Sequence, residues 1–253
     1  MAALTGSTIA STYTGLLKTS DSGARGAEGS ADQCSDGAGN TIPLFVSATE
    51  VYAIGSGTGT SHTAFGKDCG VDLAAGTGNS LFGEGAGADV STGEHNVAVG
   101  YHALYQGTTE TDDNVAIGYN AMSGAWTTAA VNDCVVIGSG AGAGALVAAA
   151  SGLTAVGTAA GAAVTSGTKN TIVGYAAGDA LTSSSYNTVL GHGALSTEVT
   201  GGTATAIGTE ALGLQNQGDG DNTENTGVGY RAGYNNVTGK SNTYLGFLAG
   251  QGA

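Results

Sequence analysis

A short motif recurs along most of this chain, and it constrains the fold more than any other feature. Asn96–Leu104 (NVAVGYHAL) returns almost unchanged as Asn114–Met122 (NVAIGYNAM). Aligning every copy on the glycine that follows its apolar run gives twelve units, whose spacings range from 11 to 21 residues and are most often 17. A fixed period of this length predicts an array of stacked coils. We call these glycines the anchor glycines: Gly55, Gly66, Gly83, Gly100, Gly118, Gly138, Gly157, Gly174, Gly191, Gly208, Gly229 and Gly246.

The residues before each anchor glycine predict a short strand with two buried faces. The residue just before the glycine is apolar in all twelve units, and its neighbour is usually apolar too. Consecutive apolar residues point to opposite faces of a strand, so one face would line the coil and the other would need a covering layer. Another copy of the chain is the simplest supplier. The predicted structural core is Val99, Ile117, Ile137, Val156, Val173, Leu190, Ile207, Val228 and Leu245.

Three further columns of the repeat carry structural expectations. An alanine stands three residues after the anchor glycine in ten of the twelve units, which predicts a tightly packed layer. The anchor glycines predict positive φ or close backbone approach. Asparagines at the unit starts (Asn79, Asn96, Asn114, Asn170, Asn187, Asn225 and Asn242) predict a ladder of amides hydrogen-bonded from coil to coil. The polar remainder of each unit predicts a solvent-facing return strand and turn.

The fold class expected is therefore all-β: a parallel β-roll or β-solenoid of about twelve repeats over residues 51–253, after a short N-terminal module over 1–50. At ~4.8 Å per coil, twelve coils make a shaft roughly 55 Å long. Within the module, Thr5–Lys18 predicts a short helix, Ser20–Asn40 a loop, and Leu44–Val46 a strand leading into the array.

Composition excludes several partners. With 6 Lys plus Arg against 20 Asp plus Glu, the net charge is −14, which disfavours nucleic acid and anionic membrane surfaces. No apolar run approaches a membrane span, and the start of the chain predicts no secretory signal. Cys34, Cys69 and Cys134 lack metal-ligand spacing, so reduced thiols are expected.

No pattern predicts an enzyme, a cofactor or a metal. Gly138–Gly142 resembles a phosphate loop by letters only, and the four histidines form no His-x-His pair. Two acidic clusters, Glu110 to Asp113 and Asp219 to Glu224, lie in loops too short to form a glycan-cleaving cleft. A calcium ion beside Asp219–Asn222 stays an alternative, although the rest of an EF-hand loop is missing.

Aromatic and threonine residues are the remaining candidates for packing or binding positions. Tyr101, Tyr119, Tyr175, Tyr230 and Phe247 follow their anchor glycines, and we expect them to pack along the rod. Exposed aromatics outside the repeat columns often bind sugars and proteins, so the predicted receptor contacts are Tyr105, Trp126, Tyr186 and Tyr234. An unbroken rank of threonines from Thr154 to Thr243 raises ice binding as an alternative. Its spacing from the apolar column places the rank near the core, which weighs against that function.

The repeat, as in Asn114–Gly118, resembles those of bacteriophage tail fibre proteins and is similar to the head repeat of YadA-like trimeric adhesins. Ile9–Asp21 and Asp36–Asn40 resemble the start of such fibre proteins. The resemblance implies a left-handed homotrimeric β-roll in a virion appendage, made in the host cytoplasm, which contributes to host attachment without catalysis. Its partners would be other copies, virion proteins bound by the N-terminal module, and a host receptor or glycan. The alternative is a bacterial surface adhesin or extracellular filament subunit.

Overall fold

The computed structural model describes residues 31–35, 41–47, 51–52 and 62–251, the last range without 74, 107–110, 125–129, 147–149 and 219. The chain divides into two compact units, residues 1–52 and 53–253. The coil anchored at Gly55, the helix expected over Thr5–Lys18 and the side chain of Cys34 lie outside the described parts.

The first unit contains an antiparallel pair of strands. β1 (Ala31–Ser35) pairs with β2 (Thr41–Ser47), with Ala31 opposite Ser47. β2 contains the strand predicted at residues 44–46, whereas β1 lies in a segment predicted to be a loop. The Ser/Asp/Gly composition of residues 20–40 conceals that strand, because pairing with β2 and not local propensity defines it. β3 (Val51–Tyr52) follows.

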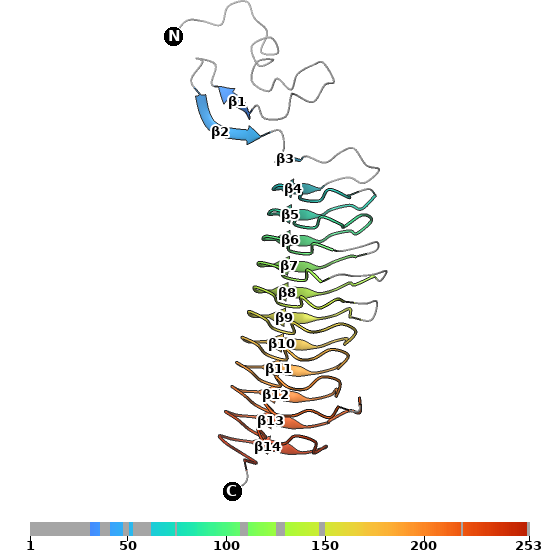
Figure 1. The fold of residues 1–253 in the computed structure, drawn as a ribbon, viewed down its shortest axis with the longest axis vertical. Helices are drawn as coiled ribbons and strands as arrows, with labels where there is room; N and C mark the ends of the chain where they lie inside the picture. Colours follow the sequence, from blue (N-terminus) through green and yellow to red (C-terminus); the bar gives the residue numbers. More distant parts are fainter. Residues whose placement is uncertain are drawn as a thin grey trace, which may run out of the picture. The chain divides into compact units, whose positions relative to one another are not determined.

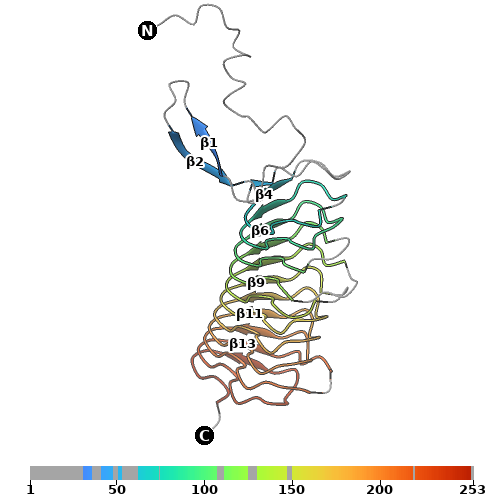
Figure 2. The same cartoon turned by 45° about the horizontal axis from the view of Figure 1, so that its top comes forward.

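The second unit is a stack of coils, each of which contributes one three-residue strand to a single parallel sheet (Figures 1 and 2). Neighbouring strands pair residue for residue, for example Val97 with Val115 and Val99 with Ile117. This is the predicted parallel β-solenoid. Its described strands are β4 (Thr63–Phe65), β5 (Ser80–Phe82), β6 (Val97–Val99), β7 (Val115–Ile117), β8 (Val135–Ile137), β9 (Thr154–Val156), β10 (Thr171–Val173), β11 (Thr188–Leu190), β12 (Thr205–Ile207), β13 (Thr226–Val228) and β14 (Thr243–Leu245).

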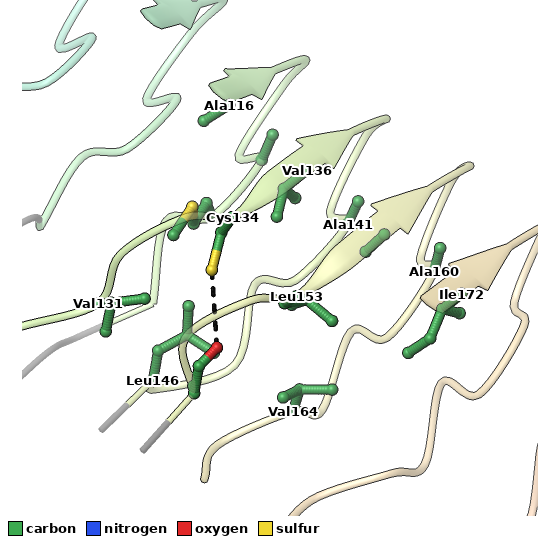
Figure 3. Packing of buried hydrophobic residues seen from close by; sticks show 14 of the residues in the cluster. Ala116, Val131, Cys134, Val136, Ala141, Leu146, Leu153, Ala160, Val164 and Ile172 are labelled. Carbon is green, nitrogen blue, oxygen red and sulfur yellow. Dashed lines mark hydrogen bonds between the residues drawn. The ribbon is translucent and has the colours of Figure 1, made fainter. Parts of the chain in front are cut away.

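The core runs through the interior of the coils. The middle residue of each strand points inward, and Ala98, Ala116, Val136 and Ile172 are fully buried. The alanine column after the anchor glycines packs against them, as predicted, and side chains from the far side of the coils, such as Val131, Leu146 and Val164, close the interior (Figure 3). Across the described coils the far side forms turns and contains no strand, so the predicted return strand is wrong.

The predicted structural core column lies on the side of the strands that the single chain does not cover. The last residue of each strand, from Val99 through Ile117 to Leu245, points away from the interior and is partly or largely exposed. Alternation along a strand explains this orientation, because only one of two consecutive apolar residues can face the inside of the same coil. The column belongs to the second face, for which the sequence predicts a covering layer, and its burial in an assembly stays a prediction.

The anchor glycines behave as predicted. From Gly66 to Gly246, the anchor glycines that the structure describes have φ angles between +120° and +141°, a region that side chains rarely adopt. A Cβ atom on Gly118 would lie 2.7 Å from the carbonyl oxygen of Gly138 in the next coil. Close stacking of the coils therefore requires glycine at this corner.

The two described cysteines are free and buried. Cys134 lies among aliphatic side chains, and its Sγ donates to the carbonyl of Ala150 over 3.6 Å (Figure 3). Burial raises the pKa of the Cys69 and Cys134 thiols to about 11, so both stay protonated and unreactive at neutral pH.

Candidate functional site

The outer side of the array's sheet is a uniform surface. We define the outer face as the first and last residues of strands β4–β14. None of these side chains is buried, and none carries a charge. The last residue is always aliphatic or phenylalanine, and the first is threonine, valine or serine.

The outer face is long and continuous because the strands pair in register. Eleven strands at ~4.8 Å spacing form a strip roughly 50 Å long. Exposure of its larger side chains is substantial, at 55% for Phe65, 47% for Leu190 and 76% for Leu245. Soluble monomers rarely expose contiguous apolar patches beyond a few hundred Å². The outer face therefore has the character of an interaction surface.

Two zones follow one another along the outer face from β6 onward. In β6–β8 both outward residues are aliphatic, as in Val115 and Ile117. From β9 to β14 the first residue is always threonine, and these threonines pair in register with one another. The threonine rank is partly or fully exposed, so its predicted position near the core is wrong. It lies on the same side as the apolar column, but that side is the outer one.

The residue after each anchor glycine forms a second exposed column, which we call the ring column. Tyr101 stacks on Tyr119 with 5.4 Å between ring centroids, and Tyr230 stacks on Phe247 at 5.3 Å. Packing of these rings along the rod is thus confirmed.

The predicted receptor contacts do not gather at one place. Tyr105 is half-buried and stacks on His102, with 4.1 Å between ring centroids. Tyr234 occupies the equivalent position seven coils further on, where Arg231 lies over its ring, with Cζ 5.0 Å from the centroid. Both rings are therefore already engaged by neighbours.

The other two predicted receptor contacts are Tyr186 and Trp126. Tyr186 is 58% exposed, with the Nζ of Lys169 5.5 Å from its ring centroid. Trp126 lies outside the described residues. Only Tyr186 offers an open surface among the three described candidates.

The acidic clusters are parts of the coil framework. Asp112 Oδ1 accepts the N–H of Glu94 in the preceding coil over 2.8 Å, and Asp221 pairs with Lys240. Glu110 and Asp219 are outside the described residues. Among the residues that are described, no group of three His, Cys, Asp or Glu side chains is placed to hold a metal ion.

Sequence reasoning missed one buried carboxylate. Glu198 is fully buried and accepts the backbone N–H groups of Val199, Thr200 and Gly201, the last over 2.8 Å. Gln215 Nε2 donates to its second oxygen over 3.3 Å. Leu181 fills the same position one coil earlier, so aligning this column would have revealed the change from leucine to glutamate.

These features define a parallel β-solenoid with an uncharged outer sheet face. No family model matches the chain, and no curated protein or solved structure matches it either. In the described part of the chain, no helix is long and apolar enough to cross a membrane.

Proposed function

We propose that this chain is a structural, non-catalytic shaft segment whose copies associate through the outer face. One observation carries the proposal: a strip of eleven paired strands turns an unbroken row of aliphatic and phenylalanine side chains toward solvent. Covering such a strip removes apolar area from water at about 25 cal/mol per Å².

A second copy of the same chain is the favoured occupant for electrostatic reasons. Each chain carries a net charge of −14, so two copies repel one another over most of their surfaces. The outer face carries no charge, and its contact with another copy brings no like charges together. Closed symmetry is the usual form of such association. Three strips turned toward one axis would cover one another, which agrees with the homotrimer implied by the sequence resemblance.

The role we propose is that of a phage tail fibre or similar virion appendage. The N-terminal unit would bind other virion proteins, and the array would extend toward a host receptor or glycan. This role rests on the resemblance of the repeat and of residues 9–21 and 36–40 to fibre proteins, together with the extended coil array.

A charge in the outer face tests the association. Ile117 lies at the centre of the aliphatic zone and is half-buried in the single chain, so Ile117→Asp should fold normally but fail to associate, because burial of an unpaired carboxylate is costly. Ser139→Asp, at an exposed position in the ring column, is the matched control. Light scattering should give the mass of one chain for Ile117→Asp and the wild-type mass for Ser139→Asp, with unchanged circular dichroism in both. An Ile117→Asp protein of wild-type oligomeric mass would refute association through this face.

A second candidate function uses the exposed threonine rank. Thr171, Thr188 and their in-register neighbours place hydroxyls at a regular interval on one sheet face, which favours contact with ordered water or ice. The two functions compete for one surface. Thermal hysteresis in a monomeric wild-type protein would support ice binding, whereas an oligomer without hysteresis supports the shaft.

A further inference from the structure

The ring column contains an interruption between two stacked pairs. Its rings stack coil on coil in three pairs, with centroids 5.3–5.4 Å apart and ring planes within 16° of parallel: Tyr101 with Tyr119, Tyr175 with His192, and Tyr230 with Phe247. Between the first and second pairs, two consecutive coils carry Ser139 and Thr158 instead of a ring, and both residues are exposed.

Two ring faces remain open at this interruption. A planar ring has two faces, and Tyr119 uses one of them on Tyr101. The other face points along the array toward Ser139. Tyr175 likewise stacks on His192 with one face, and its free face points back toward Thr158. Tyr119 and Tyr175 are 58% and 59% exposed, against 41% for Tyr101, which stacks with two rings, His102 and Tyr119.

The separation of the two free faces fits small rings. Three coil steps of ~4.8 Å place Tyr119 and Tyr175 about 14 Å apart along the array. Stacked rings lie about 4.5 Å apart at closest, so this interval holds two further rings. A short glycan supplies one sugar ring to each free tyrosine face, because its glycosidic bonds join the rings at their edges and leave their apolar faces open.

The surface between the two tyrosines is polar but uncharged, as a neutral sugar requires. Ser139 and Thr158 offer hydroxyls that both donate and accept hydrogen bonds. The residues that follow them are Gly140 and Ala159, and a Cβ atom on Gly140 would meet nothing within 4 Å. None of these four residues carries a charge, which suits a neutral ligand. A nucleic acid, whose bases also stack on aromatics, is disfavoured by the net charge of −14.

We expect this stretch to stay accessible when the outer face is covered. The ring column includes Lys67, Glu84 and His192, whereas the last residue of every array strand is apolar. A column that carries charges has the composition of a hydrated interface rim.

We propose that Tyr119 and Tyr175, together with Ser139 and Thr158, form a binding site for a short neutral glycan of two or three sugars. The apolar faces of the sugar rings stack on the two tyrosines, and the sugar hydroxyls bond to Ser139 and Thr158. The site specifies a ligand for the proposed attachment function and rests on that proposed function. It does not depend on the oligomeric state.

A glycan array tests the site. The full chain is applied to an array of neutral oligosaccharides of α- and β-linked glucose, galactose, mannose and N-acetylhexosamines, and the Kd of the best ligand is measured by calorimetry. Tyr119→Ala and Tyr175→Ala should each weaken binding roughly threefold to tenfold. Thr158→Tyr should abolish binding, because it continues the ring column across the interruption. Tyr230→Ala, in the same column but in a different pair, should bind like wild type.

Three results would overturn the site: no neutral oligosaccharide retained by the wild type, wild-type affinity in Thr158→Tyr, or equal weakening by Tyr230→Ala. The native mass of every variant distinguishes failure of the glycan site from failure of the proposed shaft assembly. A monomeric wild type refutes the assembly and leaves the glycan result intact, and an oligomer that retains no glycan refutes only the site.

Discussion

Asn96 donates both its side-chain Nδ2, over 3.0 Å, and its backbone N–H, over 2.8 Å, to the Oδ1 atom of Asn79 in the preceding coil. Asn114 repeats this bond to Asn96, and the same contact links Asn187 to Asn170. These amides lie inside the array, where each unmet hydrogen bond costs more than in water. The ladder therefore fixes the register between coils.

Asn114→Ala should lower the free energy of unfolding by about 2–4 kcal/mol, since it leaves buried groups unpaired. Asn114 is fully buried, and its removal deprives the N–H of Cys134 and the carbonyl of Val131 of their partners. Asn242→Ala is the control, because Asn242 is half-buried in the coil of β14. Urea unfolding at fixed chain concentration measures both losses. Equal losses would contradict the role of the buried ladder.

Gly118→Ala should destabilise the array by more than about 3 kcal/mol through backbone strain and steric overlap. The φ angle of Gly118 is +134°, and the added Cβ would lie 2.7 Å from the carbonyl oxygen of Gly138. Gly140→Ala at φ +64°, with open space around its Cβ position, should cost only about 1 kcal/mol. Thermal unfolding of the two variants compares them directly, and similar melting temperatures would refute the requirement for glycine at the corner.

Glu198→Leu should loosen the C-terminal coils although leucine fills this position in an earlier coil. The substitution removes the acceptor of the buried N–H group of Gly201 and of the half-buried N–H groups of Val199 and Thr200, at a cost of about 3 kcal/mol. Glu198→Gln keeps one acceptor oxygen and should cost less. Hydrogen exchange should speed up around residues 198–217 in Glu198→Leu and leave β5–β8 unchanged. Wild-type exchange at residues 199–201 would show that the carboxylate is dispensable.

Asp179→Asn should stabilise the protein at neutral pH. Burial raises the pKa of Asp179, and its Oδ1 atom is buried without a hydrogen-bond partner. A raised carboxyl pKa means that the charged form is disfavoured in the folded state, so this group lowers stability as pH rises above its unfolded pKa of about 3.9. The gain from Asn should be present at pH 7, where the carboxylate is charged in both states. It should vanish near pH 2.5, where the acid is neutral in both states. A gain of the same size at both pH values would exclude the charge as its cause.

Much of the array could be predicted because its columns repeat a physical requirement in every coil. The anchor glycines, the alanine layer and the asparagine ladder each recur at one position, so their roles follow from the period. The orientation of Ile117 and its column could not be predicted from the period, because a pair of consecutive apolar residues does not show which of the two faces the interior. The free faces of Tyr119 and Tyr175 depend on which coils stack, and that information lies in the three-dimensional register. Glu198 escaped notice because its neighbours, Ser196 to Gly202, read as an ordinary polar loop.

The mass of the native protein in solution tests the central claim most directly. Light scattering on the full chain should give a value near three times the 24.3 kDa of one chain, since the outer faces of three copies would cover one another. A clean value of 24.3 kDa at micromolar concentration would contradict the account, because the outer face would then remain in water and its apolar row would need another explanation.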